Sequence, residues 1–159
     1  MSPPLPPGWL SPNFTLAELT ASQEAARRGI DNTPGPKALA NLYRLAACLE
    51  EVRTLCGSVP VIVSSGYRCL RLNRAIGSDD TSAHVLGLAA DITAPRFGGP
   101  LKLAHLVASV GPWFIDQVIY EGSWVHLGLA PASTKPRRQL LTAVFRPGQR
   151  TTYTEGLPA

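Results

Sequence analysis

Apolar side chains recur every three or four residues in three separate parts of the chain. The longest stretch begins at Pro36 and ends before Gly57, and its apolar face consists of Leu39, Leu42, Leu45, Ala46, Leu49 and Val52. This spacing is typical of an amphipathic helix that turns one face toward a core. The same reasoning predicts helices over residues 15–28 and 100–110, and a short helix is expected over 70–76.

Short runs of β-branched and other apolar residues predict the strands. They cover residues 59–63, 89–93, 117–121 and 124–128, and residues 139–145 are expected to add an edge strand. Gly122 and Ser123 separate two of these runs, which therefore should form a hairpin with a two-residue turn. Together the elements predict an α+β fold with a small, largely antiparallel sheet and helices packed on one side.

The composition agrees with one globular unit. The chain has 159 residues, of which 45% are hydrophobic and 16% charged, and this is enough to bury one sizeable core. Proline dominates residues 1–12, so this segment is expected to form an extended arm that either lies over the domain or stays mobile. We therefore expect a single, monomeric domain over residues 13–159.

The net charge is only mildly basic. Fifteen basic residues against eleven acidic ones give a formal charge of +4, without the clustered patch that is typical of nucleic-acid binding. Residues 130–159 contain one acid, Glu155, and five bases, which are Lys135, Arg137, Arg138, Arg146 and Arg150. This basic segment is either a solvated surface or a contact with an anionic surface.

The sequence shows neither a membrane span nor a secretion signal. A bilayer requires roughly 20 consecutive apolar residues, and no run approaches that length. The first residues also lack the basic and apolar regions of a signal peptide. We therefore expect the protein to be made in the cytoplasm without an export signal.

The three cysteines are expected to be free thiols. Cys48, Cys56 and Cys69 form an odd number without C-x-x-C spacing, which favours neither a disulfide framework nor a thiolate zinc site. Cys48 and Cys56 fall eight residues apart on one predicted helix, a separation of about 12 Å, which is too long for a disulfide.

Two of the three histidines lie at the edges of predicted strands. His84 precedes Asp91 by seven residues, and His126 lies in the second strand of the hairpin. Imidazole and carboxylate groups both bind zinc, and three protein ligands leave one tetrahedral position open, as in catalytic zinc sites. The remaining histidine, His105, falls among apolar residues of a predicted helix and is expected to pack or to face solvent.

The hairpin places a carboxylate near this histidine. With a two-residue turn, Glu121 pairs with Trp124 and Ile119 pairs with His126, so Glu121, Trp124 and His126 share one face. Glu121 is then either a general base or an exposed acid at the tip of the hairpin. Asp116 has the opposite parity and should point away, unless a bulge changes its direction.

Three sequence blocks, in this order and spacing, resemble the D-alanyl-D-alanine carboxypeptidase family of zinc peptidases, peptidase family M15. They are Ser65-Gly-Tyr-Arg68, Ser82-Ala-His84 with Gly87 to Ile92, and Asp116 to His126. Phe14 to Leu19 and Asp31 to Pro34 are similar to the subgroup found in phage endolysins and bacterial wall enzymes.

The resemblance implies roles for individual residues. His84, Asp91 and His126 match the zinc ligands of the family, which hold one Zn²⁺ per chain, and Arg68 matches an arginine that engages substrate. Several members place a glutamate three positions before the last ligand, where this chain has Ser123. Other members use the position five before it, where Glu121 stands. The expected substrate-binding residues are Arg68, Tyr67, Ser82 and Trp124, although core packing is the commoner role of residues such as Tyr67 and Trp124.

The resemblance also implies a substrate, the stem peptides of bacterial peptidoglycan. The leading interpretation is a lytic endopeptidase of the endolysin type, released to the cell wall with the help of another factor. The same site could instead remove terminal D-alanine as a carboxypeptidase or dipeptidase. The Hedgehog signalling domain resembles this family in fold and zinc site, so a binding module without hydrolysis is a third interpretation.

Overall fold

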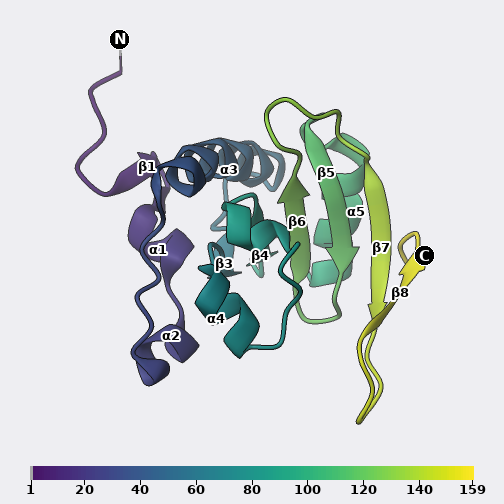
Figure 1. Ribbon diagram of the computed structural model, residues 1–159. Helices are drawn as coiled ribbons and strands as arrows, with labels where there is room; N and C mark the ends of the chain where they lie inside the picture. Colours follow the sequence, from purple (N-terminus) through teal and green to yellow (C-terminus); the bar gives the residue numbers. More distant parts are fainter. Residues whose placement is uncertain (1) are drawn as a thin grey trace.

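The computed structural model describes residues 2–159 of the chain (Figure 1). Its elements are β1 (Trp9–Ser11), β2 (Phe14–Thr15), α1 (Leu16–Thr20), α2 (Gln23–Arg28), α3 (Pro36–Leu55), β3 (Ile62–Ser65), α4 (Leu70–Ala75), the 3₁₀ helix η1 (Ala83–Leu86), β4 (Ala89–Thr93), α5 (Pro100–Val110), β5 (Ile115–Tyr120), β6 (Val125–Leu129), β7 (Gln139–Val144) and β8 (Thr152–Glu155).

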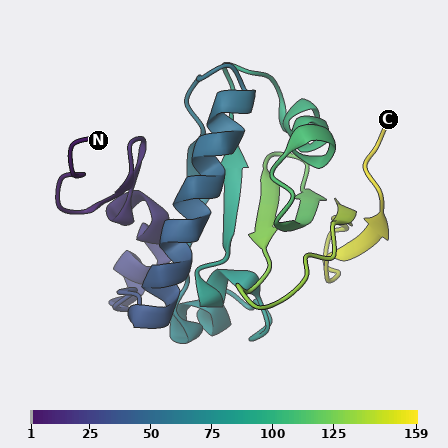
Figure 2. The same cartoon turned by 90° about the horizontal axis from the view of Figure 1, so that it is seen from above.

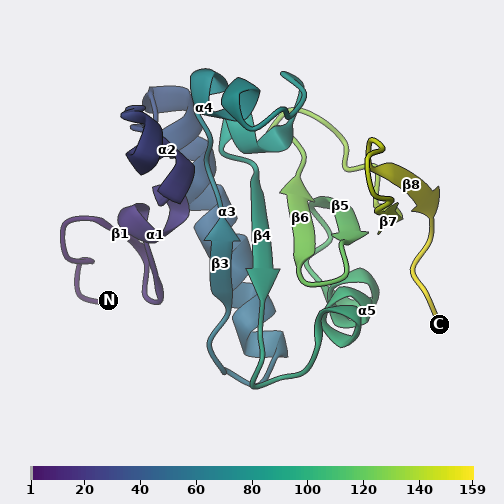
Figure 3. The same ribbon diagram turned by 90° about the horizontal axis from the view of Figure 1, so that it is seen from below.

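One six-stranded sheet forms the centre of the molecule. Its strands follow the order β3-β4-β6-β5-β7-β8, and every neighbouring pair is antiparallel except β5 and β7, which are parallel. Figures 2 and 3 show α3 and α5 on the same face of this sheet, while α1, α2 and α4 gather beside its β3 edge (Figure 1). The predicted α+β fold with a largely antiparallel sheet is confirmed.

Side chains along the central strands alternate between a face that packs into the core and an open face. Ala90 and Ile92 of β4, and Val125 and Leu127 of β6, are fully buried in the main hydrophobic cluster with the apolar face of α3. Side chains of successive residues in a strand point to opposite faces, so Asp91 and His126 emerge on the other side of the sheet. The core thus fixes which face carries the polar residues.

The register of the predicted hairpin is confirmed. Ile119 pairs with His126 and Tyr120 with Val125, and the Glu121 amide donates a hydrogen bond to the Trp124 carbonyl at 3.0 Å. Strand β5 begins two residues earlier than predicted and contains an irregularity between Ile115 and Gln117.

The helix predicted over residues 15–28 is wrong as a single element, because the structure contains two short helices. Ala21 adopts an extended conformation, and Ser22 begins a new helix by accepting a hydrogen bond from the amide of Ala25. Serine side chains favour such cap positions over helix interiors. The predicted cap of the first helix is confirmed, since Thr15 accepts from the Glu18 amide at 3.1 Å.

The C-terminal segment extends the sheet further than predicted. Strand β7 is not an edge strand, because β8 pairs with it on the outer side. The polar sequence of β8 shows no apolar alternation, and all four of its residues are exposed. A hydrophobic pattern therefore gives no indication of this strand.

Part of the proline-rich arm belongs to the fold. Strand β1 pairs with β2, Leu10 is buried in the main cluster, and Ser11 donates to Glu50 of α3 at 2.7 Å. Within residues 2–159, no helix combines the length and the apolar character that crossing a membrane requires.

Candidate metal centre

His84 lies at the start of η1 with its ring orientation fixed by the backbone. Its Nδ1 lies 2.7 Å from the Gly66 carbonyl oxygen, and the side chain is almost completely buried. A carbonyl oxygen only accepts, so Nδ1 carries the proton and Nε2 presents a lone pair. This arrangement is typical of metal-binding histidines, in which the second ring nitrogen bonds to a backbone carbonyl.

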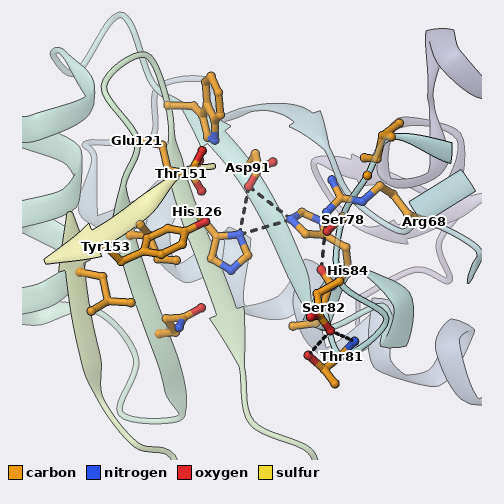
Figure 4. Close-up of a pocket in the computed structure, with 18 of the residues that line it drawn as sticks. Arg68, Ser78, Thr81, Ser82, His84, Asp91, Glu121, His126, Thr151 and Tyr153 are labelled. Atoms are coloured by element: carbon orange, nitrogen blue, oxygen red, sulfur yellow. Dashed lines mark hydrogen bonds and ion pairs between the residues drawn. The ribbon is translucent and has the colours of Figure 1, made fainter. Parts of the chain in front are cut away.

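Asp91 and His126 are cross-strand partners on β4 and β6, so their side chains leave the sheet together. The Oδ1 atom of Asp91 lies 3.1 Å from His126 Nδ1 and 3.3 Å from His84 Nε2. The two ring nitrogens are 3.3 Å apart. Figure 4 shows the three side chains converging at the base of the cleft.

The three converging atoms fit a zinc ion. Zinc ligands at about 2.0–2.1 Å in tetrahedral geometry are about 3.3 Å from one another, which is close to the separations of these atoms. The set of two imidazoles and one carboxylate is also a known ligand combination for catalytic zinc. No further Cys, His, Asp or Glu among residues 2–159 joins the cluster, so a fourth position is free of protein ligands.

Burial and mutual contacts tune the protonation of this cluster. Burial lowers the pKa of His84, which keeps its imidazole neutral. Burial alone would raise the pKa of Asp91, but the neighbouring imidazoles of His126 and His84 outweigh it and hold this pKa well below its usual value. A neutral imidazole and an ionised carboxylate are the states that bind a metal.

Arg68 lies on the His84 side of the cluster. Its guanidinium donates to Asn73 Oδ1 at 3.1 Å, to Ser65 Oγ at 3.1 Å and to Ser82 Oγ at 3.5 Å. Arg68 forms no surface salt bridge, because no carboxylate within residues 2–159 lies at ion-pair distance from it. Burial lowers the pKa of Arg68, although the charges of Asp91 and Glu121 act in the opposite direction, and this half-buried guanidinium lines the cleft without an ion-pair partner among residues 2–159. Such a group is suited to binding an anion.

Glu121 lies on the His126 side and lines the same cleft. Burial raises its pKa, and the Asp91 carboxylate acts in the same direction. The nearby His126 and Arg68 act in the opposite direction on the pKa of Glu121. Glu121 is thus a partly buried cleft residue and not an exposed acid at the hairpin tip.

Asp116 and Tyr67 do not line the cleft. Asp116 lies at the irregularity of β5 and does not line the cleft, and its carboxylate accepts from the Arg137 amide at 2.7 Å and from the Arg137 guanidinium at 2.7 and 3.0 Å. Tyr67 packs in the main hydrophobic cluster and does not line the cleft, which agrees with the alternative of core packing. Ser82 and Trp124 do line it.

The cleft over the cluster has a volume of about 930 Å³ and includes residues that the sequence pattern did not reveal. They come from the loop after α4, from β5 and from the C-terminal segment, and are Ile76, Gly77, Ser78, Asp79, Thr81, Gln117, Ile119, Arg137, Leu141, Gln149, Arg150, Thr151 and Tyr153. The exposed, polar β8 gives no signal that would place Tyr153 near a metal site. His105 is not part of the cleft, and its Nε2 bonds to the Pro158 carbonyl.

Most of the chain, including the metal cluster, is similar to a known protein family. No curated protein sequence matches the chain. A family model described as Peptidase M15 matches residues 12–128, which is well over half of the chain and includes all three residues of the cluster. The chain belongs to the peptidase M15 family.

Proposed function

We propose that this protein is a zinc-dependent peptidase that hydrolyses an amide bond in peptidoglycan stem peptides, and that it acts as a lytic endopeptidase. The observation that carries this proposal is the convergence of His84, Asp91 and His126 at the base of a cleft. Glu121 and Arg68 face that cleft from opposite sides of the cluster (Figure 4). Family membership supports the hydrolase class.

His84, Asp91 and His126 would hold the metal, and the protein residues around them would carry the proton and bind the substrate. When bound, zinc acts as a Lewis acid that polarises a carbonyl and increases the acidity of water. Glu121 accepts the proton of the attacking water and then donates it to the leaving amine, as a general base and acid. Its raised pKa suits both steps, because the carboxyl group must take up the proton and release it again.

Arg68 would bind a carboxylate of the substrate. Ser65, Asn73 and Ser82 hold its guanidinium through neutral oxygen atoms, so none of these contacts is an ion pair. Stem peptides carry free carboxylates, so this cation provides orientation and selectivity at the His84 end of the cleft.

The shape of the cleft supports cleavage within a peptide. Lining residues lie on both sides of the cluster, from Ser78 and Thr81 near His84 to Thr151 and Tyr153 near His126 (Figure 4). A peptide can therefore continue past the scissile bond in both directions. A carboxypeptidase would need a cleft that extends on only one side of the cluster, because it removes a terminal residue. A binding module like the Hedgehog domain would not need Glu121 at the cluster.

Mass spectrometry of cell-wall fragments tests this function. Purified peptidoglycan and soluble muropeptides are each incubated with the zinc-loaded protein, and His126→Ala serves as the control that lacks a ligand. We expect stem peptides cut at an internal bond, with no product from the variant. Release of terminal D-alanine alone would show a carboxypeptidase, and binding of muropeptides without any product would show a binding module.

A further inference from the structure

The β7–β8 hairpin lies outside the part of the chain that matches the family, which ends at residue 128. It nevertheless belongs to the same sheet. Strand β7 pairs in parallel with β5 from Gln117↔Gln139 to Tyr120↔Thr142, and β8 pairs with β7. The hairpin therefore extends the open face of the sheet that carries His126.

Several contacts fix this hairpin in place. Arg137, just before β7, forms the ion pair with Asp116. The ring of Phe145 packs against Trp124 with centroids 6.3 Å apart, and the Gly156 amide donates to the Leu140 carbonyl at 2.8 Å. The hairpin is thus held at both ends and along its length.

Strand parity directs Tyr153 into the cleft. Ile119 of β5 lines the cleft and pairs with Leu141 of β7, which also lines it. Ala143 lies two residues further along β7, on the same face, and it pairs with Tyr153. Tyr153 therefore emerges on the face of His126, and Figure 4 shows its ring next to that histidine.

The environment of Tyr153 leaves its phenol accessible and close to the metal centre. About half of the residue is exposed to solvent, at 51%. Burial of the remainder raises the pKa of Tyr153, and the negative charges of Glu121 and Asp91 act in the same direction. The proposed mechanism uses Glu121 for proton transfer and Arg68 for binding a substrate carboxylate. It gives Tyr153 no role.

The hairpin also faces the loop after α4 across the cleft. Hydrogen bonds from Thr81 hold the pKa of Asp79 below its usual value, and the positive charge of Arg150 contributes to this effect. Both Asp79 and Arg150 line the cleft. The hairpin is therefore the wall of the cleft that lies opposite the Arg68 side.

We propose that Tyr153 is a substrate-contacting residue: on the His126 side of the cluster, its phenol hydrogen-bonds a backbone amide of the peptide whose carboxylate Arg68 holds on the His84 side. A phenol both donates and accepts, so it suits the N–H or the carbonyl of an uncharged amide. Its ring covers apolar parts of the same peptide. This assignment rests on the proposed peptidase function.

Steady-state kinetics on a soluble muropeptide test the contact. We expect Tyr153→Phe to raise KM about 3- to 10-fold with kcat unchanged, because one hydrogen bond of ground-state binding is lost. Tyr153→Ala should raise KM further, since the ring is also removed. Tyr43→Phe, on the exposed surface of α3, is the matched control and should behave as wild type. Unchanged KM in both Tyr153 variants, or a loss confined to kcat, would overturn the proposal.

A binding measurement separates this inference from the proposed function. The chain has four tyrosines, and ¹³C-labelled tyrosine rings can be followed by NMR in zinc-loaded Glu121→Gln protein, with Tyr153→Phe identifying the signal. Added muropeptide should shift the Tyr153 signal and leave that of Tyr43 in place. If the wild type cleaves no muropeptide, the proposed function fails, whereas an unmoved Tyr153 signal overturns the inference whether or not cleavage occurs.

Discussion

Gly66 links the packing of the N-terminal half to the metal centre. Its carbonyl oxygen orients His84, and its Cα lies so close to α1 that an added Cβ would overlap the backbone carbonyl of Leu19. The amide of the next residue, Tyr67, donates to that same carbonyl at 2.8 Å. A glycine is thus required where α1 approaches the loop that positions a ligand.

Gly66→Ala is expected to weaken both folding and metal binding. Displacing this backbone should lower the free energy of unfolding by about 1–3 kcal/mol, as overpacking does, and weaken zinc affinity about 10- to 100-fold through the loss of the orienting carbonyl. Chemical denaturation and competition with a zinc chelator measure the two effects. Gly35→Ala is the control, because open space surrounds that glycine. Equal zinc affinity in the two variants would contradict the role of the Gly66 carbonyl.

Glu121→Gln should separate proton transfer from metal binding. The variant keeps the shape of the side chain and removes its basicity, so kcat should fall roughly 10²- to 10⁴-fold, which corresponds to about 3–5 kcal/mol of barrier. Zinc content, measured by elemental analysis, should stay at one per chain. A variant that loses zinc would identify Glu121 as a ligand, and full activity would exclude it as the base.

The cluster residues were predictable from sequence because three short blocks that carry them resemble peptidase family M15. The hairpin turn sets the parity of Glu121 relative to His126 and so predicted that both lie on one face. The position of Tyr67 was not predictable in this way. It lies in an irregular segment between β3 and α4, where no period relates sequence position to direction.

Among the secondary-structure elements, the long helices were predicted most reliably, from apolar residues that recur every three or four positions. The boundaries of α3 and α5 agree with the prediction, since each begins at a proline and ends close to a glycine. The break between α1 and α2 depends on Ser22, whose cap competes with continuation of the helix. Strand β8 is stabilised by pairing with β7 and not by an apolar face, so a hydrophobic pattern cannot reveal it.

The Asp116–Arg137 pair fixes the start of β7, and its contribution should depend on pH. Burial acts to raise the pKa of Asp116, but hydrogen bonds from Arg137 outweigh it and lower the pKa below the ordinary value of about 3.9. A lowered folded-state pKa adds stability above the unfolded value and loses it as the pH falls through the folded value.

Asp116→Asn should therefore lower the free energy of unfolding by about 1 kcal/mol at pH 7, a modest amount because the Arg137 side chain is 60% exposed. Below about pH 4 the difference from wild type should shrink, because the wild-type carboxylate becomes protonated there. Urea unfolding at both pH values measures this change. The kcat of Asp116→Asn should fall far less than that of Glu121→Gln. A stability difference that grows toward low pH would contradict a lowered pKa of Asp116 in the folded protein.

On the scale of the whole molecule, the basic segment divides into structural and free charges. Arg137 pairs with Asp116, Arg138 donates to the Pro112 carbonyl at 2.8 Å, and Arg150 lines the cleft. Lys135 and Arg146 are exposed, and no carboxylate of residues 2–159 lies within ion-pair distance of either. The sequence alone could not separate these groups, because the partners of Arg137 and Arg138 are more than 20 residues away.

We propose that Lys135 and Arg146 help to attach the protein to an anionic wall or membrane surface. Replacing both with glutamine should weaken the affinity for cell walls, measured by co-sedimentation, about 30-fold at low salt, because each basic residue near an anionic surface contributes about 1 kcal/mol. The effect should fade at about 0.5 M salt, where exposed charges are screened. Lys37→Gln with Arg71→Gln removes the same charge from exposed positions on α3 and α4 and should leave sedimentation unchanged. Equal losses in the two double variants would show that net charge, and not this segment, controls attachment, while hydrolysis of a soluble peptide should be the same in all of them.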